Sequence, residues 1–155
     1  MEQATFAAGC FWGVEDAFSA TPGIVSTRVG YIGGSMEHPT YHDVCTGMTG
    51  HAEAVEVTFD PEIISYEKLL NIFWQCHDPT QFNRQGPDLG AQYRSAIFYH
   101  SDAQKIVAEE SLERLDASGR LRRQIATVIV PSAVFWEAEE YHQKYHQKHG
   151  GGCGF

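Results

Sequence analysis

Hydrophobic and polar residues alternate from Glu53 to Phe59 in the sequence EAVEVTF. This period of two is typical of a β-strand with one buried face. Glu53 therefore points to the same side of the strand as its apolar residues, which are Val55, Val57 and Phe59. Short runs rich in β-branched and aromatic residues predict further strands at residues 4–8, 24–32, 95–100 and 125–130.

Helices are predicted where apolar residues recur every three or four positions after a capping residue. Ser65 can cap a helix that runs to about His77 and carries an apolar face. Pro22 and Gly23 end an earlier helix. The four expected helices cover residues 11–20, 65–77, 102–118 and 136–149.

The predicted elements alternate between strands and helices, with long irregular connections at residues 33–50 and 78–94. The strands are too few and too irregularly linked for a nucleotide-binding parallel sheet. We therefore predict an α+β fold, a two-layer sandwich with a ferredoxin-like (α/β plait) core of two interlocked strand-helix-strand units. Residues 1–155 should form one domain with a flexible glycine-rich C-terminal tail from about residue 149 to residue 155.

The amino-acid composition limits the kinds of molecule that the protein is expected to bind. The 155 residues are 43% hydrophobic, and their formal charge of -9 disfavours nucleic acid, which is bound mainly through Lys and Arg. The one basic cluster is interpreted as a solvated helix end and comprises Arg120, Arg122 and Arg123. No secretory leader or membrane-spanning apolar run is visible, so a soluble, cytoplasmic protein that binds no membrane is expected. A monomer is also expected, although nothing in the sequence shows the oligomeric state.

Cys10 is the best candidate nucleophile in the chain. It follows Gly9 at a predicted strand-to-helix junction, where exposed backbone N–H groups and the helix dipole stabilise a thiolate. The alternative is a small buried thiol at a packed strand end. The other cysteines, which form no CxxC pair and are too sparse for a disulfide scaffold, are Cys45, Cys76 and Cys153.

Two kinds of residue favour a pocket around such a nucleophile: an aromatic pair and a carboxylic acid. Phe11 and Trp12 are either core residues or the walls of an apolar pocket that suits a methyl group. Glu53 on an apolar face must be paired or protonated, so it is either a proton donor or a structural residue paired with Arg28 or Arg94.

The long connections hold further candidates. Tyr41, Asp88 and Tyr93 lie there, where polar and aromatic residues are functional when a rigid scaffold positions them, although turn and surface roles are common. At the C-terminus, four potential metal ligands are spaced so that three of them share a helical face: His142, His146, His149 and Cys153. The glutamate of an HExxH site is missing, but a metal-binding module remains an alternative.

Several motifs together resemble the peptide methionine sulfoxide reductases of type A. They run in order through nearly the whole chain: GCFWG at residues 9–13, GYIGG at 30–34, PTY at 39–41, TGHAEAVEV at 49–57, HDPT at 77–80, RQG at 84–86, QYRS at 92–95 and EAEEYHQ at 137–143. So many matches are far more specific than any one of them.

This resemblance implies a role for each candidate residue. Cys10 would be the catalytic cysteine, and Glu53 the acid that binds and protonates the sulfoxide oxygen. Phe11 and Trp12 would hold the methyl group of the substrate. The supporting residues of the binding site would be Tyr41, Tyr93, Asp88 and His142.

The implied reaction is reduction of the S epimer of methionine sulfoxide, free or in proteins, without a bound cofactor. Cys10 would become a sulfenic acid, which a second thiol can convert to a disulfide. Cys153, flanked by glycines, is the expected second thiol, and the resemblance implies thioredoxin as the reductant of the disulfide. A thiol peroxidase using the same Cys10 is the other alternative.

One departure from the family pattern concerns recycling. Many members carry two C-terminal cysteines, whereas this chain carries only Cys153 there. Participation of Cys45 in recycling therefore stays open, while Cys76 is interpreted as structural because it lies near the apolar face of its helix.

Overall fold

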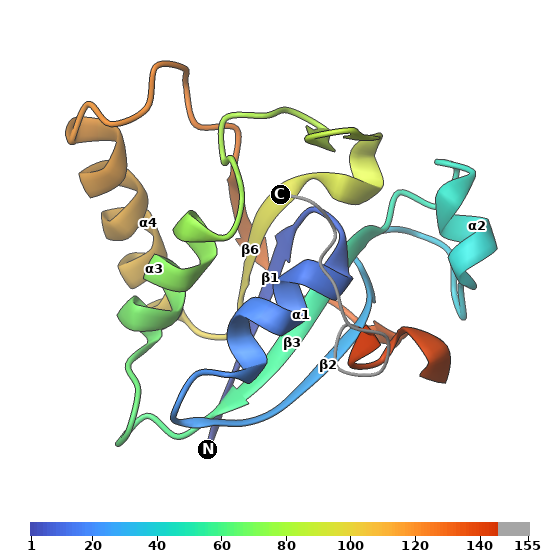
Figure 1. The fold of residues 1–155 in the computed structure, drawn as a ribbon, viewed down its shortest axis with the longest axis horizontal. Coiled ribbons are helices and arrows are strands. Elements are labelled where there is room, and N and C mark those ends of the chain that lie inside the picture. Colours follow the sequence, from blue (N-terminus) through green and yellow to red (C-terminus); the bar gives the residue numbers. More distant parts are fainter. Residues whose placement is uncertain (146–155) are drawn as a thin grey trace.

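A computed structural model describes residues 1–145 of the chain. Within these residues the strands form one six-stranded sheet in the order β7-β6-β1-β3-β2-β8 and a small hairpin, β4-β5 (Figure 1). The strands of the main sheet are β1 (Glu2–Ala8), β2 (Ile24–Ile32), β3 (Ala52–Phe59), β6 (Ser95–Tyr99), β7 (Val128–Pro131) and β8 (Trp136–Glu137). The hairpin comprises β4 (Arg84–Gln85) and β5 (Asp88–Leu89).

Four α-helices and two 3-10 helices accompany the strands in the described part of the chain. Ser65 and Ser101 each accept a backbone N–H three residues ahead, and Thr40 forms a full capping box with Asp43. The helices are α1 (Phe11–Ser19), α2 (Tyr41–Cys45), α3 (Tyr66–Gln75), α4 (Asp102–Ala117), η1 (Ala91–Tyr93) and η2 (Glu140–His142). The short helix α2 lies inside the connection that the sequence predicted to be irregular.

Strands β1 and β3 are the centre of the sheet. β1 pairs antiparallel with both β3 and β6, while β3 pairs antiparallel with β2. Two strand-helix-strand units, β1-α1-β2 and β3-α3-β6, therefore interlock, because each places a strand between the two strands of the other. The predicted α+β class is confirmed, and the ferredoxin-like description of its core stays a prediction.

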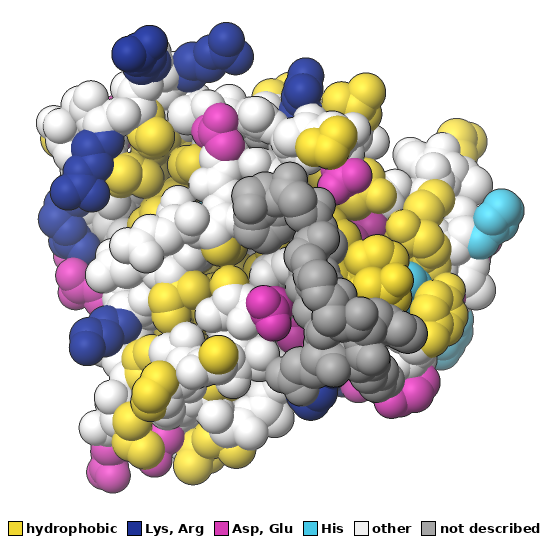
Figure 2. Space-filling view, in the orientation of Figure 1, with side chains coloured by type: hydrophobic (Ala, Val, Ile, Leu, Met, Phe, Trp, Pro, Cys, Tyr) yellow, Lys and Arg dark blue, Asp and Glu magenta, His cyan; other side chains and the backbone are white. Residues whose placement is uncertain are grey.

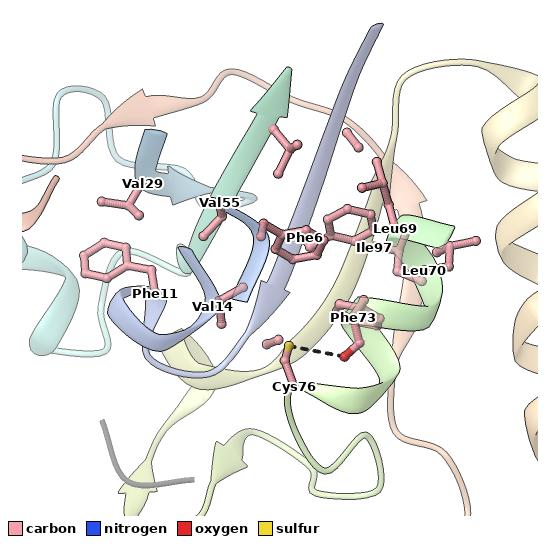
Figure 3. Close-up of a cluster of buried hydrophobic side chains, with 14 of the residues drawn as sticks. Phe6, Phe11, Val14, Val29, Val55, Leu69, Leu70, Phe73, Cys76 and Ile97 are labelled. Atoms are coloured by element: carbon pink, nitrogen blue, oxygen red, sulfur yellow. Dashed lines mark hydrogen bonds between the residues drawn. The ribbon is translucent and has the colours of Figure 1, made fainter. Parts of the chain in front are cut away.

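The main core lies between the sheet and helices α1 and α3 (Figure 3). Phe6 of β1 is fully buried, and its ring centroid lies 5.1 Å from that of Phe18 on α1 and 5.3 Å from that of Phe73 on α3. Cys76 closes one end of this core, with its thiol donating to the Phe73 carbonyl at 3.3 Å. Burial raises the pKa of Cys76 to about 12, which keeps it a protonated packing residue.

The C-terminal segment differs from its prediction. A helix was expected over residues 136–149, but residues 136–137 form β8 and residues 140–142 form only η2. The reason is the open edge of β2, which offers unpaired backbone groups. The Ala138 N–H donates to the Val29 carbonyl at 2.9 Å, and the Gln143 side chain both accepts from the Val29 N–H and donates to its carbonyl.

Charged side chains are unevenly spread over the surface. Figure 2 shows several Lys and Arg side chains over α4 and the segment that follows it. The predicted arginine cluster falls in this segment, where its three members line one shallow hollow beside Asp78. No helix within residues 1–145 combines the length and the apolar character needed to cross a membrane.

Candidate functional site

Cys10 lies at the junction between β1 and α1, as its sequence context predicted. It is the N-cap residue of α1 and is partly exposed. Gly9 reaches this turn with a φ of 96°, and a Cβ at that position would meet Cγ of Gln85 at 2.8 Å, so glycine is required there. The thiol thus stands at the N-terminal end of a helix dipole, where a thiolate is stabilised.

Glu53 lies on β3 with only 1% of its surface exposed, on the same face as Val55 and Val57. Its Oε1 accepts the backbone N–H of Phe11 at 3.2 Å. This bond links the carboxyl group to the residue directly after Cys10. The alternative partners are engaged elsewhere: Arg28 pairs with Glu56 at 2.8 Å, and Arg94 donates to the Ala91 carbonyl at 3.0 Å.

Tyr41 and Tyr93 face the same carboxyl group from α2 and η1. Burial, together with the negative charge of Glu53, raises the pKa of both phenols well above the ordinary value. The two phenols also influence each other, so they lie close together. Both therefore remain protonated at neutral pH and can donate hydrogen bonds into the space beside Glu53.

Aromatic rings form the adjoining wall of the site. Phe11 is buried and Trp12 is partly exposed, and the Phe11 ring lies 6.5 Å from the Tyr41 ring between centroids. His142, only 1% exposed, fits among them, with its ring centroid 5.2 Å from that of Phe11 and 4.6 Å from that of Tyr41. The structure thus brings His142 to the predicted aromatic pair.

Two residues of this region were not singled out from the sequence. Glu139 accepts the Tyr31 hydroxyl and the Tyr41 N–H, each at 3.0 Å, and so joins the C-terminal segment to β2 and α2. Although its partial burial acts in the opposite direction, these hydrogen bonds lower the pKa of Glu139. Gln92 donates to Oε2 of Glu53 at 2.7 Å. Both residues fall in motifs of the resemblance, EAEEYHQ and QYRS, which was the only available signal.

The remaining candidate residues are Asp88, Cys45 and Cys153. Asp88 lies half-buried on β5, and its charge contributes to the raised pKa of Tyr93, so it is close to that phenol. Cys45 is exposed at the end of α2, where it contributes to the raised pKa of Tyr41 and Nε2 of Gln92 lies 3.7 Å from its sulfur. Cys153 lies outside the described residues.

The metal hypothesis receives no support from the part of the chain that is described. Among residues 1–145, no group of three or more His, Cys, Asp or Glu side chains is placed to hold a metal ion. Nδ1 of His142 is occupied as an acceptor for the Trp12 indole N–H at 3.0 Å. Three of the four proposed ligands, His146, His149 and Cys153, lie outside the described residues.

A thiol at a helix N-terminus, next to a buried carboxyl group and two protonated phenols, is the arrangement expected of a thiol-dependent oxidoreductase. The family model "Peptide methionine sulfoxide reductase" matches residues 2–154. The chain therefore belongs to the peptide methionine sulfoxide reductase family.

Individual relatives agree with this assignment. The chain is 65% identical over 147 residues to "Peptide methionine sulfoxide reductase MsrA" of Methanothermobacter thermautotrophicus, covering 95% of this chain and 87% of that protein. Mxr1 from Saccharomyces cerevisiae in reduced form matches with a TM-score of 0.91 and 39% identity, covering 97% of this chain and 87% of that chain. Mxr1 in complex with Trx2 matches with a TM-score of 0.66 and 30% identity over 93% of this chain and 84% of that chain.

Proposed function

We propose that this protein reduces the S epimer of methionine sulfoxide, free or in proteins, through a sulfenic acid on Cys10 and then a Cys10–Cys153 disulfide that thioredoxin reduces. One observation carries the proposal: the Phe11 N–H donates to Glu53, so the acid is held beside the helix start that presents Cys10. A nucleophile and a proton donor can thereby act on opposite ends of one S–O bond.

The chemical step needs both groups at once. The Cys10 thiolate attacks the sulfoxide sulfur while the oxygen, which gains negative charge, takes a proton from Glu53. The Tyr41 and Tyr93 hydroxyls donate hydrogen bonds to the same oxygen as its charge grows. The attack forms an S–S bond between Cys10 and the substrate sulfur. The protonated oxygen then passes from the substrate sulfur to the Cys10 sulfur as that S–S bond breaks, so methionine leaves two electrons richer, Cys10 becomes a sulfenic acid and Glu53 is left as a carboxylate.

Selection of the substrate follows from the aromatic wall. Phe11 and Trp12 provide an apolar surface for the methyl group on sulfur, while the polar side of the pocket binds the oxygen. With the methyl group and the oxygen each on its own surface and Cys10 attacking from a fixed direction, the remaining substituent of the sulfur fits in only one of the two configurations. His142 supports the wall through its hydrogen bond with the Trp12 indole, and Asp88 acts near Tyr93 as a supporting residue.

Recycling requires a second thiol and an external reductant. Cys153 attacks the Cys10 sulfenic acid, water leaves, and a disulfide remains. The solved structure of Mxr1 with Trx2 supports thioredoxin as the reductant of that disulfide. No bound cofactor enters this scheme; a cytoplasmic location, a monomeric state and a single domain over residues 1–155 remain predictions.

The direct test is an assay of purified protein with dithiothreitol on the two separated epimers of a methyl sulfoxide. We expect turnover of the S epimer only, and none of it with Cys10→Ser. Absence of turnover with either epimer, or equal turnover of both, would overturn the proposal.

A further inference from the structure

The two oxygens of Glu53 are held by two different donors. Oε1 accepts the Phe11 backbone N–H from α1 at 3.2 Å, and Oε2 accepts Nε2 of Gln92 from η1 at 2.7 Å. The second bond is the shorter one, and both of its partners are buried, with 1% of Glu53 and 8% of Gln92 exposed. The orientation of the carboxyl plane is therefore set from two separate elements.

Gln92 is itself held in place by the turn that contains it. Gly90 starts this turn with a φ of 121°, and its carbonyl accepts the Tyr93 N–H at 3.0 Å. The backbone N–H of Arg94 and its Nη1 atom both donate to the Ala91 carbonyl, at 3.2 and 3.0 Å. The amide of Gln92 is thus presented to Glu53 by a rigid turn.

The chemistry of these donors restricts where Glu53 can carry a proton. A backbone N–H and the NH₂ group of a glutamine donate but do not accept hydrogen bonds. An acidic proton cannot point at either of them, so it must occupy another position on the carboxyl group. The charge of Glu53 acts on the phenols of Tyr41 and Tyr93, so both lie near this carboxyl group, and in the proposed function the substrate oxygen binds among the three groups and receives that proton.

We propose that Gln92 is a positioning residue for the acid: its amide fixes Oε2 of Glu53 and so directs the proton of the carboxyl group to the sulfoxide oxygen. This inference rests on the proposed function of Glu53. Gln92 does not touch the substrate in this scheme and acts only through Glu53. Two consequences distinguish that role from a general packing role.

The first consequence is a change in the pH profile of the chemical step. Gln92→Met keeps the length of the side chain and removes its donor. In a single turnover without reductant, methionine release should slow ~10-fold or more, in the range of one lost hydrogen bond to a charged group. The alkaline limb of the profile should move to higher pH, because a carboxylate without its donor holds its proton more tightly.

The variant leaves the other titrating groups near Glu53 in place: Cys10, Tyr31, Tyr41, Cys45 and Tyr93. Because Nε2 of Gln92 also lies 3.7 Å from the Cys45 sulfur, the same comparison is made in a Cys45→Ser background, where the shift should persist. Gln104→Met is the matched control. Gln104 is equally buried at 7% exposed, and it bonds to the His100 N–H and the Gln3 carbonyl on a distant part of the sheet. It should leave both the rate and the profile unchanged.

The second consequence concerns the double variant. If Gln92 acts only through Glu53, then Gln92→Met added to Glu53→Gln should slow methionine release no further than Glu53→Gln alone. Independent, multiplying effects of the two substitutions, or an unshifted alkaline limb in Gln92→Met, would overturn the inference. A Glu53→Gln variant as fast as the unmodified protein would instead overturn the proposed function, and this inference with it.

Discussion

The indole N–H of Trp12 donates to Nδ1 of His142 at 3.0 Å, across 130 positions of the sequence. Because Nδ1 accepts this bond, the neutral ring carries its hydrogen on Nε2, which is buried without a hydrogen-bond partner among residues 1–145. Burial lowers the pKa of His142, which favours this neutral form. The orientation of the Trp12 indole is thereby fixed by a residue of the C-terminal segment.

Replacing this histidine should therefore weaken substrate binding more than chemistry. His142→Phe keeps a ring among Phe11, Trp12 and Tyr41 but removes the acceptor for the indole. We expect KM to rise about 5- to 10-fold, in the range of one net hydrogen bond, with a smaller change in kcat. Steady-state kinetics with dithiothreitol measure both; His42→Phe, at an exposed position of α2, is the control. A fall in kcat alone would contradict this role.

Glu53→Gln should slow methionine release in a single turnover by ~100-fold or more, because it removes a general acid while keeping the shape of the side chain. Glu56→Gln is the control on the same strand, since Glu56 pairs with Arg28 outside the pocket. The comparison also separates the alternatives: a thiol peroxidase based on Cys10 would have little need of Glu53. If Glu53→Gln impairs neither peroxide reduction nor sulfoxide reduction, the thiol peroxidase alternative is favoured.

The strands and the position of Glu53 were predictable because their signals are local. Alternation along residues 53–59 placed the carboxyl group on the apolar face, and Gly9 with Pro22 marked both ends of the first helical segment. The C-terminal segment was not predictable in this way. The contacts of Val29, Glu139 and Gln143 show why. Instead of forming the predicted helix, this segment pairs with the edge of β2. That pairing joins residues far apart in the sequence, such as Val29 and Gln143, which are 114 positions apart.

The same limit applies within the site. Cys10, Phe11 and Glu53 could be chosen from their residue types and local context, whereas nothing local indicates that Gln92 reaches Glu53 across 39 positions. The family resemblance supplied the roles of Tyr41, Asp88, Tyr93 and His142, and the structure supplied the contacts among them. Periodicity alone finds which face a residue occupies, but not which distant side chain it meets there.

Cys153→Ser should separate chemistry from recycling. Without reductant, the variant should still release one methionine per Cys10 and then stop with Cys10 oxidised, because the sulfenic acid has lost its expected partner thiol. Thiol counting and mass mapping of the products measure this directly. Cys45→Ser should still form the Cys10–Cys153 disulfide. If Cys153→Ser instead forms a bridge to Cys45 and turns over normally with thioredoxin, the recycling role belongs to Cys45.

Stability should fall in mild acid because of His77. Its Nδ1 donates to the Phe73 carbonyl at 2.7 Å, and its Nε2 meets the Ser95 hydroxyl at 2.8 Å. Burial lowers the pKa of His77 to about 4 in the folded protein, from an ordinary value of 6.5. The unfolded chain therefore binds a proton as the pH falls below about 6.5, while the folded protein does not until about pH 4.

The stabilisation by neutral His77 should thus be present above pH 6.5 and be lost progressively between pH 6.5 and 4. A shift of this size corresponds to ~3 kcal/mol over the whole window. Urea unfolding at several pH values should show His77→Gln to be less stable than the unmodified protein at neutral pH, since its two hydrogen bonds are disturbed. The difference should narrow as the pH falls, because the variant lacks the group that titrates. His42→Gln changes an exposed histidine and should keep the pH dependence of the unmodified protein. If the free energies of unfolding of His77→Gln and the unmodified protein differ by the same amount at every pH, His77 does not cause the acid sensitivity.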